Sequence, residues 1–331
     1  MTESPRVSVV IPSYNHGSFV EAAARSVLDS WDDLELVVVD DGSTDDSRER
    51  LQAMGDGRLR LFLQENQGAH AALSRGIDQS RGEFVFILNS DDVFHPRRIE
   101  RVLEVFVGHP SAALVCSWLE IIDASDAPLG VKKAWQNLPP WPPPQPGPGL
   151  AETGDPLLAM LTQNFVSTTS NVAFRRQRWL ERELHFAPLR YTHDWDFILA
   201  CCDAPGDLRV IDDPLVRYRV HGQNTIAEGR DEGEERMHFE ILWTLARHAH
   251  RILTAYSQQG FDFADLRQRL WRSVPDFGQT GLFAQLLTLR GQSEEVPASY
   301  DRLLHWQRTA RGWQDLQESA PNRHPSATIP G

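Results

Sequence analysis

The first 120 residues alternate short apolar runs with amphipathic stretches, and this alternation restricts the chain to few folds. The apolar runs are VSVVIP (7–12), LELVVVD (34–40), RLRLFLQ (58–64) and EFVFILN (83–89). Continuous apolar strands joined by helices are typical of parallel sheets that are covered on both faces, with right-handed crossovers. The sequence therefore predicts an α/β fold with a mostly parallel, Rossmann-like sheet.

Local signals predict where two of the connecting helices begin. In SFVEAAARSVL, Ser18 and Glu21 fit a capping box, and in DGSTDDSRERL either Ser43 or Thr44 can cap the next helix. A further apolar stretch, AALVCSWLEIID (112–123), predicts another strand.

The second half of the chain predicts a different organisation. LPPWPPPQPGPG (138–149) reads as an extended surface loop, either a plain linker or a lid that uses Trp135 and Trp141. From residue 231 onward the apolar residues have helical periodicity, and we expect the tail 319–331 to be disordered. We expect an α/β domain over 1–222 and a helical region over 223–318, which could support a homo-oligomer, receive a ligand or contact a membrane.

Charge and composition exclude several functions. The net charge of -13 argues against a nucleic-acid partner, because that binding depends on clustered Lys and Arg. No apolar run is long enough to span a bilayer, and three cysteines cannot form a disulfide framework. We expect a cytoplasmic protein, which could also lie peripherally at the inner membrane face.

Polar residues follow each predicted strand, where ligands of open α/β sheets bind. They are Ser13, Tyr14 and Asn15 after the first strand, Asp40 and Asp41 after the second, Glu65 and Asn66 after the third, and Asn89, Asp91 and Asp92 after the fourth. The four strand ends should face one crevice.

Asp91 and Asp92 are the strongest hint of chemistry. Two carboxylates about 4 Å apart repel by roughly 4 kcal/mol at an intermediate dielectric, so a divalent cation such as Mg²⁺ or Mn²⁺ would stabilise them. The alternative is a solvated turn at a helix N-terminus before PRRIERVLEVF. At the second acidic pair, Asp40 and Asp41 could accept hydrogen bonds from a base or ribose, and Tyr14 could stack on a base.

Five motifs together resemble the family 2 glycosyltransferases of the GT-A fold. They are VSVVIPSYNHGSFVEAAARSVL, LELVVVDDGSTDDS, NQGAHAALSRGIDQSRGEFVFILNSDDVFHP, HDWDF and PLVRYRVHGQNT, which cover roughly the first 222 residues in order. The resemblance implies a GT-A sheet with a helical C-terminal region.

The resemblance also implies donor-binding residues. The nucleotide would be held by Pro12, Ser13, Tyr14, Asn15, Asp40, Asp41, Asn66, Asn89 and Asp91. The segment after the fourth strand is the DxD-type motif, with Asp91 and Asp92 as ligands of Mn²⁺ or Mg²⁺ and His221 completing the shell or contacting the diphosphate. Asn89 departs from the family, in which many members carry Asp there.

The motif YTHDWDF (191–197) would supply the general base, Asp194, with an N-cap of the following helix as the structural alternative. His193 stands where the family usually has Glu, and Asp196 is a fallback base. His193 and Trp195 could contact the acceptor or sugar, although Trp195 could equally be a core residue. Four arginines could bind ligand or be structural: Arg175, Arg176, Arg217 and Arg219.

The implied activity is an inverting transfer of a sugar from a nucleoside diphosphate to a hydroxyl of a saccharide or glycoconjugate. A UDP-sugar is favoured as donor over a dTDP- or GDP-sugar. Two alternatives stay open: a non-catalytic sugar-nucleotide binding protein, because Asn89 and His193 each replace a usual carboxylate, and a nucleotidyltransferase of related architecture.

Overall fold

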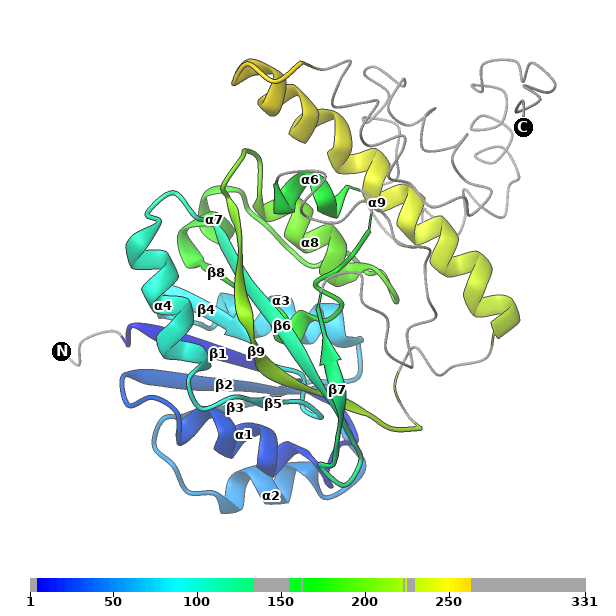
Figure 1. The fold of residues 1–331 in the computed structure, drawn as a ribbon. Helices are drawn as coiled ribbons and strands as arrows, with labels where there is room; N and C mark the ends of the chain where they lie inside the picture. Colours follow the sequence, from blue (N-terminus) through cyan, green and yellow to red (C-terminus); the bar gives the residue numbers. More distant parts are fainter. Residues whose placement is uncertain (1–4, 134–154, 162, 223, 225–229, 263–331) are drawn as a thin grey trace.

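The computed structural model in Figure 1 describes residues 5–133, 155–161, 163–222, 224 and 230–262. Several predictions lie outside these residues: the proline-rich segment 138–149 with Trp135 and Trp141, the helices expected beyond residue 262, and the tail 319–331. Among the described residues, no helix is at once long and apolar enough to cross a bilayer.

The described strands form one mixed sheet of nine strands in the order β3-β2-β1-β4-β8-β6-β9-β5, with β7 paired to β6. The strands are β1 (Val7–Ser13), β2 (Leu34–Asp40), β3 (Leu59–Leu63), β4 (Phe84–Ile87), β5 (Val93–Phe94), β6 (Leu114–Asp123), β7 (Pro128–Lys132), β8 (Ala173–Arg175) and β9 (Leu208–Val220). The helices are α1 (Val20–Leu28), α2 (Ser47–Ala53), α3 (Ala69–Asp78), α4 (Arg98–Gly108), α6 (Pro156–Met160), α7 (Arg176–Glu181), α8 (His193–Cys201) and α9 (Arg230–Gln258), with a 3-10 turn, η1 (Thr169–Asn171).

The sheet has a parallel half and a mixed half. The four strands predicted from the alternating pattern, β1 to β4, are parallel neighbours. Beyond β4, the short β8 runs antiparallel to both β4 and β6, and β6 is parallel to β9. The α/β prediction is confirmed, and the mixed half brings the end of β9 beside β5 and the turn that precedes it.

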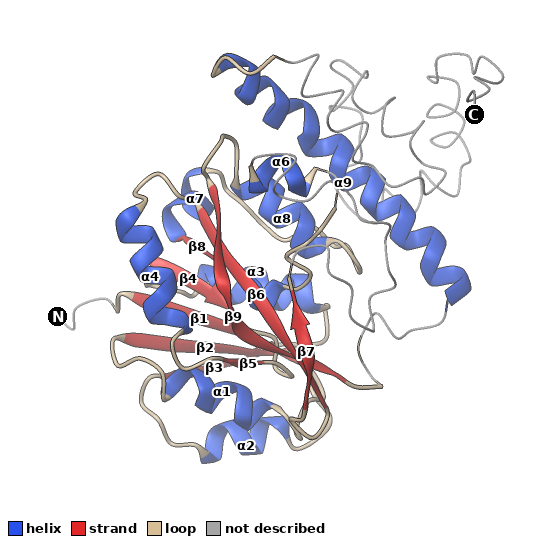
Figure 2. Cartoon of the chain, in the orientation of Figure 1, coloured by secondary structure: helices blue, strands red, loops and turns tan. Residues whose placement is uncertain are grey.

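Helices cover both faces of the parallel half (Figure 2). Alternate residues of β1 separate into two hydrophobic clusters: Val10 packs with Leu73 of α3, whereas Val9 and Ile11 pack with Ala23 of α1. Side chains of successive strand residues point to opposite faces, so a strand that is apolar at every position must be covered on both sides.

Helix α9 shares the hydrophobic core of the sheet. Leu245 and Ile252 belong to the same buried cluster as Phe197 of α8. The buried carboxylate of Asp196 on α8 faces His248 Nε2 at 2.7 Å and accepts a hydrogen bond from Arg247 Nη1 at 3.2 Å. The predicted helical segment therefore begins with a helix, α9, that packs on α8 and the core of the sheet.

The predicted capping residues are wrong for α1 and α2. Neither helix has a side-chain cap, and Glu21 binds Arg25 instead, with Oε1 to Nη2 at 2.8 Å. Ser43 Oγ accepts the Asn15 amide and the Thr44 amide donates to Asn15 Oδ1. These tertiary bonds fix the loops at the strand ends, so local capping signals are overridden.

We predict that Gly82→Ala destabilises the fold by about 1–3 kcal/mol, because overpacking against rigid neighbours forces backbone shifts. A Cβ at Gly82 would lie 2.5 Å from the Ser8 nitrogen and 2.7 Å from the Val7 carbonyl carbon. Gly57→Ala is the matched control, since a Cβ there meets nothing within 4 Å. Urea unfolding measures both, and equal stabilities would contradict the prediction.

We also predict that Asp196→Asn lowers the free energy of unfolding by about 1–3 kcal/mol, the usual cost of disrupting a buried charged hydrogen bond. Asp213→Asn is the control: its side chain is 51% exposed and pairs with Arg101 at the surface, a contact worth at most about 1 kcal/mol. An Asp196→Asn variant as stable as the control would show that the contact between α8 and α9 is dispensable.

Candidate active site

Three potential metal ligands converge at the carboxyl edge of the sheet. Single ligand atoms of His16, Asp91 and His221 all lie within 4.8 Å of one another, and His221 Nε2 is 3.0 Å from Asp91 Oδ2. Two imidazoles and one carboxylate can hold a divalent cation. The predicted pair Asp91 and His221 is therefore brought together, and His16 joins it.

Each of these residues comes from a different element and is held by a neighbour. His16 lies between β1 and α1, where its Nδ1 is 2.8 Å from Ser90 Oγ. Asp91 lies in the turn between β4 and β5, and His221 follows β9 directly. The Asn224 side chain accepts the His221 amide and donates to the Arg219 carbonyl, so it fixes the turn that carries His221.

The surroundings favour a neutral His16 ring. Burial lowers the pKa of His16, and proximity to His221 lowers it further, against the opposing effects of Asp91 and Asp45. A neutral imidazole is the form that binds metal.

Asp92, predicted as a second metal ligand, is not part of this group. Its side chain is buried, Oδ2 accepts Ser170 Oγ at 2.5 Å, and Oδ1 accepts the Arg219 amide at 2.9 Å. Burial raises the pKa of Asp92 well above its ordinary value, and the charge of Asp91 raises it further. Asp92 therefore joins the turn between β4 and β5 to η1 and β9.

The predicted nucleotide ligand Asn89 is also engaged within the protein. Its Nδ2 donates to Thr168 Oγ1 at 3.1 Å, and its Oδ1 accepts Thr169 Oγ1 at 2.7 Å. An amide can both donate and accept, so it fits between two hydroxyls in a way that a carboxylate cannot. In the DxD-type segment, only Asp91 reaches the histidines.

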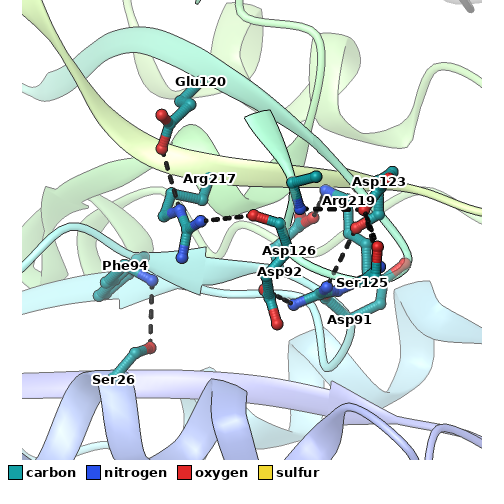
Figure 3. Close-up of polar contacts among 11 residues, drawn as sticks. Ser26, Asp91, Asp92, Phe94, Glu120, Asp123, Ser125, Asp126, Arg217 and Arg219 are labelled. Carbon is teal, nitrogen blue, oxygen red and sulfur yellow. Dashed lines mark hydrogen bonds and ion pairs between the residues drawn. The ribbon is translucent and has the colours of Figure 1, made fainter. Parts of the chain in front are cut away.

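Arg217 and Arg219 make structural contacts, as Figure 3 shows. Arg219 is buried and donates to the Asp91 carbonyl at 2.8 Å and to Asp126 Oδ1 at 2.8 Å. Arg217 donates to Glu120 Oε2 at 2.9 Å and to the Asp126 carbonyl. These bonds tie the turn between β6 and β7 to β9 and support the structural interpretation of both arginines.

The second acidic pair fixes loops at the same edge. Asp41 accepts the backbone amides of Gln67 and Gly68 at 2.9 and 2.8 Å. Asp40 accepts Arg48 Nε at 2.6 Å, and its Oδ2 is buried without a hydrogen-bond partner. Both carboxylates therefore hold the surface on which a nucleotide was predicted to lie.

The remaining predicted donor residues differ in exposure. Tyr14 is 46% exposed and Asn66 is exposed, whereas Pro12 and Ser13 are buried. Asn15 adopts a left-handed φ of 53°. Tyr14 and Asn66 are thus the side chains of this set that are most accessible to a ligand.

Asp194, the predicted base, lies in the first turn of α8 and is 5% exposed. The helix starts at His193 with Thr192 as N-cap, so Asp194 is not its N-cap. Asp194 Oδ2 accepts Asn164 Nδ2 at 3.0 Å, which orients the carboxylate.

Tyr218 on β9 links this carboxylate to the acidic turn. Burial raises the pKa of Tyr218 well above its usual value, and the charges of Asp92, Asp91 and Asp194 each raise it further. Carboxylates from two distant segments, the turn between β4 and β5 and the first turn of α8, therefore both act on this hydroxyl.

The other predictions from YTHDWDF have mixed outcomes. Asp196, the fallback base, is turned toward α9. Trp195 is a core residue: it is 5% exposed, and its Nε1 donates to the Met160 carbonyl at 2.7 Å, so it is not placed to stack on a sugar. His193 is partly buried against the Phe186 ring and, through its proximity, lowers the pKa of His70 after the larger effect of burial.

Arg175 and Arg176 lie at the opposite, amino-terminal edge of the sheet. Arg175 pairs with Phe84 at the start of β4 and donates to the Phe106 carbonyl near the end of α4. Both arginines line a groove of about 510 Å³, together with Arg6 and Arg81. The structural interpretation of Arg175 and Arg176 fits this position better than ligand binding at the carboxyl edge.

Sequence reasoning missed His16, Tyr218, Asn164 and Ser170. His16 was detectable in principle, because it follows SYN at the end of the first predicted strand. Tyr218 lies within the motif PLVRYRVHGQNT but has no signal that separates it from its neighbours, and Asn164 and Ser170 lie outside the five motifs. Only the packing of η1 and β9 beside the turn identifies these three residues.

Comparisons with known proteins bear on the family and the fold. The family description Glycosyl transferase family 2 matches residues 8–162. An uncharacterized glycosyltransferase of Nostoc sp. is 31% identical over 228 residues, which are 66% of this chain and 66% of that relative. Staphylococcus aureus TarS 1-349 in complex with UDP-GlcNAc has a TM-score of 0.60 and 17% identity, covering 96% of this chain and 82% of that one.

A second solved structure is a mannosyltransferase from Pyrobaculum calidifontis in complex with GDP-Man and Mn²⁺. Its TM-score is 0.50 at 17% identity, covering 96% of this chain and 85% of that one. At these identities the solved structures establish the fold alone. Together with the family match and the relative, they establish that this chain belongs to glycosyl transferase family 2 and has the GT-A fold.

Proposed function

We propose that this chain is an inverting glycosyltransferase, which moves a sugar from a nucleoside diphosphate to an acceptor hydroxyl on a saccharide or glycoconjugate. The observation that carries the proposal is the convergence of His16, Asp91 and His221 at the carboxyl edge of the sheet, in a chain of the glycosyltransferase family. Such a group can hold a cation against a departing diphosphate.

The donor would lie along the carboxyl ends of β1, β2 and β4. Tyr14 is exposed there and can stack on a base, and Asp40 has a buried oxygen without a partner that can accept a hydrogen bond from the nucleoside. UDP-GlcNAc bound to TarS supports a UDP-sugar as the donor. GDP-Man bound to the mannosyltransferase supports a GDP-sugar as the alternative donor.

A divalent cation, Mn²⁺ or Mg²⁺, fits the donor atoms of His16, Asp91 and His221. When bound, such an ion neutralises charge that grows on a departing diphosphate. The mannosyltransferase complex with Mn²⁺ supports a metal in this fold. Among the residues that the structure describes, Arg217 and Arg219 lie beside this group but are bound to Glu120, Asp126 and backbone carbonyls, so they add little free positive charge.

Asp194 would act as general base. Its carboxylate takes the proton of the acceptor hydroxyl while that oxygen bonds to the anomeric carbon, and the bond from that carbon to the diphosphate oxygen breaks on the opposite face. Attack opposite the leaving group inverts the anomeric configuration. The Asn164 hydrogen bond leaves the carboxylate oriented, and general-base help is worth about 10²- to 10⁴-fold in rate.

The test is a panel of UDP-, dTDP- and GDP-sugars assayed by thermal shift, with Mn²⁺ and with chelator. Stabilising donors are then incubated with saccharide acceptors, and release of nucleoside diphosphate is measured. Binding of a donor without transfer or hydrolysis would favour the non-catalytic alternative, and release of pyrophosphate from a nucleoside triphosphate would favour a nucleotidyltransferase.

We predict that Asp194→Asn lowers the transfer rate by about 10²- to 10⁴-fold with donor affinity within about twofold of the unmodified protein. The amide cannot take a proton but can still accept the Asn164 hydrogen bond. Asp196→Asn is the control, because that carboxylate faces α9; it should keep transfer at a temperature where it is folded. Equal transfer by Asp194→Asn and the unmodified protein would reject the assignment.

We predict that Tyr14→Ala weakens donor nucleotide binding by about tenfold, since stacking of a base on an aromatic ring is worth about 1–3 kcal/mol. Phe261→Ala provides the control: Phe261 is another exposed aromatic residue, 43% exposed, and lies beyond α9. Isothermal titration with the free nucleoside diphosphate measures both. An unchanged affinity of Tyr14→Ala for the nucleotide would show that the nucleobase does not stack on Tyr14.

A further inference from the structure

We propose that the cation of this enzyme is held by His16, Asp91 and His221, without Asp92, and that the site therefore prefers a transition metal such as Mn²⁺ to Mg²⁺. The inference rests on the proposed function and deepens it, because it names the ligand set and the class of metal. His16 is a ligand that the DxD-type pattern does not include.

The spacing of the three ligand atoms fits one ion. Ligands about 2.1 Å from a shared ion lie about 3–4.2 Å from one another. The three atoms lie within 4.8 Å of one another, and the pair His221 Nε2 and Asp91 Oδ2 is already 3.0 Å apart. Shifts of a few tenths of an ångström suffice to bring them to coordination distance.

Neighbouring groups form hydrogen bonds that orient the three ligand residues, as is usual for metal ligands. Ser90 Oγ lies 2.8 Å from His16 Nδ1 and can fix the orientation of the ring. Asn224 fixes the backbone at His221, and Arg219 Nε donates to the carbonyl of Asp91. Three elements of the fold are thereby locked around one point.

Asp92 is excluded by its own hydrogen bonds. Both carboxylate oxygens are used, by the Ser170 hydroxyl and the Arg219 amide, and the residue is only 1% exposed. Coordination by Asp92 would break these two bonds and separate η1 and β9 from the turn.

The ligand set determines the preferred metal. Mg²⁺ prefers oxygen donors, whereas imidazole nitrogen suits first-row transition metals. Two neutral imidazoles and one carboxylate leave a bound divalent ion with a net charge of about +1, where two carboxylates would leave it neutral. Such a site keeps a stronger attraction for a diphosphate, which matters because the described arginines beside it, Arg217 and Arg219, are engaged with Glu120, Asp126 and the Asp91 carbonyl.

The experiment is direct titration of the chelator-treated full chain with Mn²⁺ without nucleotide, followed by electron paramagnetic resonance. We expect one Mn²⁺ per chain, displaced by Mg²⁺ only at a concentration at least tenfold higher. His16→Ala, Asp91→Asn and His221→Ala should each weaken Mn²⁺ binding at least tenfold. In Asp92→Asn, the new amide can still accept the Arg219 backbone N–H and can donate to the Ser170 hydroxyl, so the turn keeps its position. This variant and the exposed-surface control His109→Ala should therefore stay within about twofold.

Pulsed resonance adds a signature that does not depend on affinity. Bound Mn²⁺ should couple to two imidazole nitrogens in the unmodified chain and to one in His16→Ala at saturating metal. Circular dichroism confirms that each variant is folded. No imidazole coupling in the unmodified chain, or loss of Mn²⁺ from a folded Asp92→Asn, would overturn the proposal.

Sugar transfer is measured separately, so the two ideas fail differently. If the three residues bind Mn²⁺ but no donor gives transfer, the metal site is supported and the transferase proposal is rejected. If the chain binds no Mn²⁺ and transfer persists in chelator, the metal site is rejected and the transferase proposal is supported.

Discussion

The buried carboxylate of Asp92 is the constraint on which the site depends. It accepts hydrogen bonds from Ser170 on η1 and from the backbone of Arg219 on β9, so it joins three segments that are far apart in sequence. Burial of a carboxylate is costly unless its oxygens are satisfied, and both are satisfied here. Because Asp92 fixes β9 against the turn, it also sets where Asp91 meets His221.

In two pairs of neighbouring acidic residues, one carboxylate makes structural contacts and the other is available to the site. In the turn between β4 and β5, Asp92 points into the protein and Asp91 points toward the histidines. On α8, Asp194 and Asp196 are two residues apart, which is about 200° around a helix, so one can face the site while the other binds α9. Asp92 thus fixes the turn that presents Asp91, and Asp196 fixes the helix that presents Asp194.

The charge balance of the site follows from the same contacts. Arg217 and Arg219 lie beside the acidic turn, but their hydrogen bonds hold the turn between β6 and β7. Asn89 spans two threonine hydroxyls, donating to one and accepting from the other. Within the described part of the chain, these two arginines therefore add little free positive charge to meet a diphosphate, and a cation beside Asp91 would provide it.

The sequence by itself determined the α/β class, the four parallel strands and the polar character of their ends, because these follow from local periodicity and from where parallel strands terminate. It also identified Asp91 and His221, which lie in motifs. Only the tertiary structure decided that His16 joins them, that Asp92 and Asn89 turn inward, that Trp195 is buried, and that Asp41 holds a loop. Which way a side chain at a strand end points depends on donors brought there by distant segments, and no local pattern encodes those donors.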